Sequence, residues 1–132
     1  MKIPDHKERL RESLSLIEES IEKGLVERQR TIGFNASAAV TDMLGIFLHK
    51  NSLIDPGIIV KHEWLKSEKS MENKFPFDFP RKEEIFALIL KIEEKRNILC
   101  YGKPQKEGLI LEMLNNFNKV KGIFKGEGIS EL

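Results

Sequence analysis

The stretch EEKRNILCYG, residues 93–102, followed two positions later by Pro104, decides how this chain is interpreted. It ends a segment with helical spacing, whose inward-facing residues are Ile85, Phe86, Leu88, Ile89, Ile92, Ile98 and Leu99. A glycine and a proline directly after such a run end a helix, because glycine tolerates the terminating conformation and proline cannot continue the hydrogen-bond pattern. The sequence therefore predicts a helix from Pro80 or Arg81 to the end of this stretch.

Four further segments carry apolar residues at helical spacing. We expect helices over about residues 5–23, from residues 25–27 to 50, from 55 to 68, and from 105 to 124. Asp5 and Gly24 are suitable first and last signals for the first of these, and Asp55 with Pro56 for the start of the third. The second is rich in small residues and is expected to be the most buried: Gly33, Ala36, Ser37, Ala38, Ala39 and Gly45.

The segment FPFDFP, residues 75–80, cannot be helical throughout. Each proline removes a backbone donor and biases the residue before it towards extended conformations. We therefore expect an aromatic loop laid across the bundle.

These elements predict an all-α fold, an antiparallel bundle of four to five helices in a single domain over residues 1–132. The ordered core is expected to span about residues 5–124, with a frayed tail at Gly126 and Gly128. No run of alternating β-branched residues and no internal repeat is present in the sequence.

Composition narrows the possible functions. The 22 basic and 21 acidic residues give a net charge of +1, so a nucleic-acid site would have to be a local patch. The single cysteine allows no intrachain disulfide, and the start of the chain is polar, so we expect a soluble, cytoplasmic protein without a membrane span. We also expect no metal and no cofactor, because the histidines lack metal-ligand spacing and no glycine-rich phosphate loop is present.

The motif Arg96-Asn97-x-x-x-Tyr101 resembles the Arg-Asn-x-x-x-His signature of the HEPN family of small helical ribonucleases and toxin-like domains, with Tyr101 at the histidine position. The helix order and the alanine-rich second helix extend the resemblance over about residues 5–124. The resemblance implies an HEPN-like bundle and a homodimer in which paired motifs cut RNA without a metal, using the 2′-hydroxyl as nucleophile. It implies that Arg96 holds a phosphate, that Asn97 orients the phosphate or the arginine, and that Tyr101 occupies the acid/base position.

Tyr101 is a poor replacement for histidine, since an ordinary phenol has a pKa of about 10 and is a weak base at neutral pH. The leading hypothesis is therefore a non-catalytic module that binds RNA through Arg96, Asn97, Lys95 and Lys103 or binds a protein partner. The resemblance suggests a toxin–antitoxin or defence context and a nucleotidyltransferase-type partner. The first alternative is an active, metal-independent endoribonuclease in which Arg96 and Tyr101, or a distant histidine, are catalytic. The second is a purely structural bundle.

Each candidate residue also has a structural interpretation. Arg96 could pair with Glu93 or Glu94, and Tyr101 could be a partly buried ring beside Pro104. Lys95, Arg96 and Lys103 could join Arg28, Arg30 and Lys106 in a basic cluster or be solvated separately. The remaining candidates are expected to be structural. We expect His6, His49 and His62 to be hydrogen-bonded or solvated, although folding could bring His49 to the motif. Cys100 is expected to be an unreactive thiol, and Asp42 either a surface or a buried group.

Overall fold

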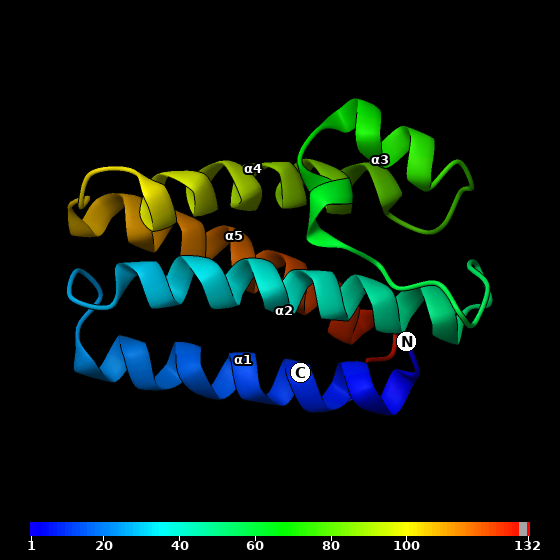
Figure 1. Ribbon diagram of the computed structural model, residues 1–132, viewed down its shortest axis with the longest axis horizontal. Helices are drawn as coiled ribbons and strands as arrows, with labels where there is room; N and C mark the ends of the chain where they lie inside the picture. Colours follow the sequence, from blue (N-terminus) through cyan, green and yellow to red (C-terminus); the bar gives the residue numbers. More distant parts are fainter. Residues whose placement is uncertain (130–131) are drawn as a thin grey trace.

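The computed structural model describes residues 1–129 and 132 (Figure 1). Within that part of the chain it contains five α-helices, one short 3-10 helix and no strand. In chain order the elements are α1 (Ile3–Lys23), α2 (Gln29–Lys50), η1 (His62–Leu65), α3 (Glu68–Lys74), α4 (Lys82–Tyr101) and α5 (Glu107–Gly126). The predicted all-α fold is confirmed.

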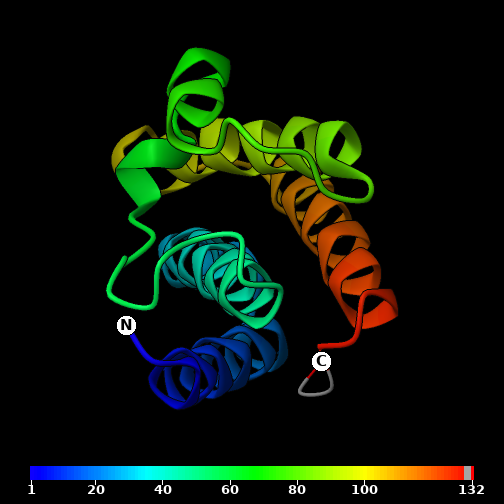
Figure 2. The same cartoon turned by 90° about the vertical axis from the view of Figure 1, so that its right-hand side faces the viewer.

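The four long helices run alternately in opposite directions, with α2 at the centre (Figures 1 and 2). α2 contacts α1, α4 and α5, and α4 also contacts α5. The short helix α3 packs on the outer side of α4, and η1 contacts both α2 and α4. As expected from its small residues, α2 is the most buried helix, with 14 buried residues.

The turn between α1 and α2 begins at Gly24, whose positive φ of 137° explains why glycine stands there. A turn over residues 24–28 follows, closed by a hydrogen bond from the Arg28 N–H to the Gly24 carbonyl. α2 therefore begins at Gln29, slightly later than the predicted start at residues 25–27.

The predicted helix over residues 55–68 is wrong. Asp55 and Pro56 form a turn in which the Ile58 N–H bonds the Asp55 carbonyl, and only the single turn of η1 is helical before residue 68. The β-branched run Ile58–Val60 favours extended backbone over helix. The stronger helix start lies at Ser67, whose side chain accepts the N–H of Ser70 at the beginning of α3.

The aromatic loop is confirmed. Phe75 is fully buried, and the Phe75, Phe77, Phe79 and Phe86 rings contact one another at centroid distances of 5.7–6.3 Å. The Lys82 ammonium donates to the Phe75 and Phe77 carbonyls, which fixes the loop to the start of α4.

The tail beyond α5 differs from the frayed end predicted at Gly126 and Gly128. Ile129 is buried and its N–H bonds the Phe124 carbonyl, while the Gly128 carbonyl accepts the Lys50 ammonium at 2.7 Å. Burial of one large apolar side chain holds this segment against the bundle, so the packed region extends beyond residue 124. Residues 130–131, also part of the predicted tail, lie outside the described residues.

α2 is also the one helix of the described chain that is long and apolar enough to cross a membrane. However, 72% of its apolar window is covered by the other helices. That burial is typical of the central helix of a bundle, which must be apolar on several faces.

A buried side-chain hydrogen bond joins α1 to α2. His6 is 1% exposed and its Nδ1 lies 2.7 Å from the Asp42 Oδ1, which decides that Asp42 is a buried hydrogen-bonding group. The imidazole ring lies against Gly45, where an added Cβ would be 2.8 Å from the His6 Cε1. The His6–Asp42 pair and the bare backbone at Gly45 therefore depend on each other.

We predict that Gly45→Ala lowers the free energy of unfolding by about 1–3 kcal/mol, because the new methyl group must displace the His6 ring from its position beside Asp42. Gly122→Ala is the matched control, since an added Cβ in α5 meets nothing within 4 Å. It should raise the stability by about 0.5–1 kcal/mol through helix propensity alone. Urea unfolding followed by circular dichroism measures both changes. An increase for Gly45→Ala would contradict this packing.

Candidate phosphate-binding site

The C-terminal half of α4 packs closely on the start of α2. A Cβ added at Gly33 would lie 3.0 Å from the Leu99 Cβ, so only glycine permits this approach without displacement of a neighbour. Two polar contacts hold the same region. The Arg30 Nε–H donates to the Cys100 carbonyl at 3.0 Å, and the Gln29 side-chain amide exchanges two hydrogen bonds with the Gln105 backbone. The first contact satisfies a carbonyl at the end of α4, and the second pairs backbone groups of the connection to α5.

Arg96 lies at this crossing and is only 6% exposed. Its guanidinium carbon is 4.9 Å from the ring centroid of Phe34 on α2 and 5.8 Å from that of Tyr101 on α4. Both distances are within the range of cation–π attraction. The two rings are themselves largely open to solvent, at 50% and 71% exposure.

The N–H groups of Arg96 are the unusual feature of the site. Among the described residues, none forms a hydrogen bond or an ion pair with the guanidinium, although it carries five donors. The Arg96 nitrogens are not fully buried. Over the described residues, the His6 Nε2 is the one fully buried side-chain nitrogen or oxygen without a partner, so the unbonded Arg96 nitrogens must keep some contact with solvent. The predicted alternative, an ordinary ion pair with Glu93 or Glu94, is not formed.

Glu93 is buried beside Arg96 but faces Ser37, whose hydroxyl donates to the Glu93 Oε1 at 2.5 Å. Burial raises the pKa of Glu93, while the Ser37 hydrogen bond and the positive charge of Arg96 act in the opposite direction. The Glu93 carboxyl therefore bonds Ser37 and forms no ion pair with Arg96. The guanidinium donors stay available to an external anion.

His62, which the sequence led us to expect as a structural residue, lies near this site. It lies on η1, which packs against α2 and α4, and the positive charge of Arg96 is close enough to act on it. Burial and then Arg96 lower the pKa of His62, so its imidazole is neutral at pH 7. The sequence did not indicate that His62 lies near Arg96. The two residues are 34 positions apart, and the helix predicted over residues 55–68 was wrong.

The other predicted binding residues do not converge on Arg96. Lys95 turns towards α5, where its ammonium lies 3.6 Å from the Glu112 Oε1. Asn97 is exposed on α4, and Lys103 is exposed in the connection to α5. Arg30 is the one member of the predicted basic cluster whose bonding fixes it to the end of α4.

Tyr101 and Cys100 differ from each other in accessibility. Tyr101 is mostly exposed, which contradicts the alternative of a partly buried ring beside Pro104. Cys100 is 2% exposed and burial raises the pKa of its thiol, as expected for an unreactive cysteine.

His49 does not approach the motif. It lies near the opposite end of α2, where its ring is 5.9 Å from that of His6 and its Nε2 is 2.9 Å from the Ile58 carbonyl oxygen. His6, His49 and Asp42 therefore belong to the contact between α1 and α2. Over the described residues, no group of three or more histidine, cysteine or carboxylate side chains is arranged to hold a metal ion.

Comparison of the chain with protein-family models, with curated proteins and with solved structures finds no match.

We predict that Glu93→Gln changes how stability depends on pH. The raised pKa means that the folded protein keeps this proton at pH values where the unfolded chain, with an ordinary value of 4.5, has lost it. Stability is therefore lost as the pH rises from 4.5 through the folded pKa, and the variant lacks this loss. The free energy of unfolding of the variant, minus that of the natural protein, should increase from pH 4 to pH 7 in urea titrations.

Glu94→Gln is the control for removal of one negative charge, because Glu94 is the exposed neighbour on the same helix. A stability difference for Glu93→Gln that is constant with pH would show that Glu93 ionises in the folded protein as it does in the unfolded chain.

Proposed function

We propose that this chain is a non-catalytic, HEPN-like helical module that binds single-stranded RNA at Arg96. The single observation that carries the proposal is the Arg96 guanidinium, which is held between two exposed aromatic rings while its N–H donors bond no described residue of the protein. A fixed cation with unused donors is a binding group for an oxyanion such as a phosphate.

The aromatic rings favour RNA over a free phosphate. Single-stranded RNA is commonly bound by stacking of its bases on aromatic side chains beside a cation that contacts the backbone. Phe34 and Tyr101 provide two such rings next to Arg96. Arg30, whose Nε–H bonds the end of α4, adds a second positive charge near the site.

The absence of a suitable proton acceptor at Tyr101 supports the non-catalytic assignment. Tyr101 is solvent-exposed and has beside it, among the described residues, no base that would take its proton, and the neighbouring carboxyl group of Glu93 already accepts the Ser37 hydroxyl in a buried position. Neither group is arranged as the base that would activate a 2′-hydroxyl.

One observation favours the second candidate, a metal-independent endoribonuclease. His62 is neutral at pH 7 because burial and the Arg96 charge lower its pKa, and a neutral imidazole can accept a proton. In this alternative His62 replaces the motif histidine as the base, and Arg96 stabilises the charge that develops on the phosphate.

The proposal includes a homodimer, which the family resemblance implies, in the cytoplasm, which the single cysteine favours. Exposed aromatic surface at Phe34 and Tyr101 would then lie where two copies bring their Arg96 side chains to one RNA strand. A nucleotidyltransferase-type protein is the alternative partner. Sedimentation equilibrium at micromolar concentration should give about twice the 15.3 kDa chain mass. A monomer at all concentrations would leave each Arg96 as a separate site and contradict the dimer.

We predict that Arg96→Ala weakens binding of a fluorescein-labelled 12-nucleotide RNA by about tenfold or more, as expected for loss of a charge-assisted phosphate contact. Tyr101→Ala should weaken it less, by about three- to tenfold, through loss of stacking. The control is Arg11→Ala, which removes one positive charge from the exposed face of α1. Fluorescence anisotropy at two salt concentrations measures all four proteins. Equal affinity of the natural protein and Arg96→Ala would place the RNA elsewhere, and no binding by either would favour a protein partner.

We predict no RNA cleavage above background by the natural protein at pH 7 in the presence of a chelator. General acid–base assistance contributes about 10²- to 10⁴-fold to such reactions, and the motif lacks its usual proton carrier. Tyr101→His should restore a measurable rate, because it places an imidazole beside Arg96. Gel analysis of a labelled RNA gives the rates. Cleavage by the natural protein that is lost in both Arg96→Ala and His62→Ala would establish the endoribonuclease instead.

A further inference from the structure

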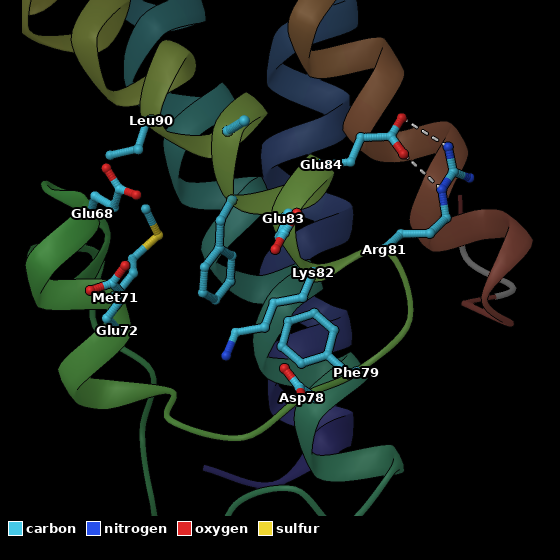
Figure 3. A pocket seen from close by; sticks show the side chains of 12 residues that line it. Glu68, Met71, Glu72, Asp78, Phe79, Arg81, Lys82, Glu83, Glu84 and Leu90 are labelled. Carbon is cyan, nitrogen blue, oxygen red and sulfur yellow. Dashed lines mark hydrogen bonds and ion pairs between the residues drawn. The ribbon is translucent and has the colours of Figure 1, made fainter.

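A second surface lies on the N-terminal half of α4, away from Arg96. An open groove of about 890 Å³ separates α3 from the first turns of α4 (Figure 3). The α4 side carries Glu83, Phe86 and Leu90, and the α3 side carries Glu68, Met71 and Glu72. Residues three and four apart share one face of a helix, so two helix faces line the same groove.

The floor of the groove is apolar. Phe86 and Leu90 are half-buried rather than covered, and Ala87 is exposed beside them. Met71 closes the α3 side from below, where it is already buried in the bundle. Apolar surface recessed between two helices is the kind of surface that an inserted side chain covers.

The rim of the groove is acidic, and its two basic residues are already engaged. Arg81 forms a two-pronged contact with Glu84, at 3.0 and 2.9 Å, on the side away from α3 (Figure 3). The Lys82 ammonium bonds the carbonyls of the aromatic loop. The other four carboxylates of the lining form no hydrogen bond or ion pair with a described residue: Glu68, Glu72, Asp78 and Glu83.

We propose that this groove docks a basic amphipathic helix of a partner protein. The partner would place large apolar side chains against Phe86, Ala87 and Leu90, and lysines or arginines against the unpaired carboxylates. The acidic rim repels RNA, so this surface is separate from the site at Arg96. A small polyamine would satisfy the carboxylates but leave the apolar floor uncovered.

The probe is a fluorescein-labelled, 16-residue helical peptide with leucines along one face and lysines on the others, titrated with the natural protein. We expect micromolar affinity that weakens with added salt. The double variant Glu68→Gln, Glu72→Gln should bind about tenfold more weakly, because two exposed charge contacts are lost. Ala87→Arg should weaken binding as strongly by filling the exposed floor with a bulky cation. The matched control, Glu18→Gln with Glu22→Gln on the exposed face of α1, should bind as the natural protein does.

All substituted positions are exposed on helices, so circular dichroism is expected to show unchanged folding. Unchanged affinity of the Glu68, Glu72 double variant would overturn the proposal. Equal binding of a peptide with serine in place of leucine would overturn it too, by showing a purely electrostatic contact. Displacement of the peptide by spermine at the peptide's own concentration would reassign the groove to small organic cations. Self-association of the natural protein that Ala87→Arg abolishes would reassign it to a second copy of the chain.

Discussion

The arrangement of the bundle depends on how closely its neighbours approach α2. Gly33 allows α4 to come so near that an added Cβ would lie 3.0 Å from the Leu99 Cβ. Gly45 allows the same for α1, through the His6 ring that bonds Asp42. A helix enclosed by three others needs such bare positions, since side chains at the crossing points would hold the backbones apart.

The close crossing of α2 and α4 also creates the site at Arg96. Phe34 follows Gly33, and Arg96 precedes Leu99 by one helical turn, so the contact between the helices brings the ring and the guanidinium together. Arg96 and Glu83 lie roughly 20 Å apart along α4, given the helical rise of about 1.5 Å per residue. The net charge of the chain is close to zero, but the chain has two surfaces of opposite charge. One is cationic and aromatic, and the other is acidic and apolar.

Local signals allowed much of the fold to be predicted from the sequence. Helix boundaries are marked by glycines and prolines, through their backbone chemistry alone: Gly24, the prolines around Phe77, and Gly102 with Pro104. The helices next to them lie about where they were expected. The helix predicted over residues 55–68 was wrong because Asp55 and Pro56 suit a turn as well as a helix start, and β-branched residues follow them. The environment of Arg96 was not predictable in the same way. Helical spacing cannot show that Lys95 faces Glu112, that Glu93 faces Ser37, or that η1 brings His62 within reach of the arginine charge.

The central claim is that the donors of Arg96 are available to an external anion. Nuclear magnetic resonance of the arginine Nε–Hε groups in ¹⁵N-labelled protein tests it directly, with Arg96→Lys used to assign the signal. We expect a rapidly exchanging Arg96 signal in the free protein that shifts and becomes protected when a short single-stranded RNA is added, while the Arg11 signal stays unchanged. An Arg96 signal that is already protected in the free protein and does not respond to RNA would contradict it.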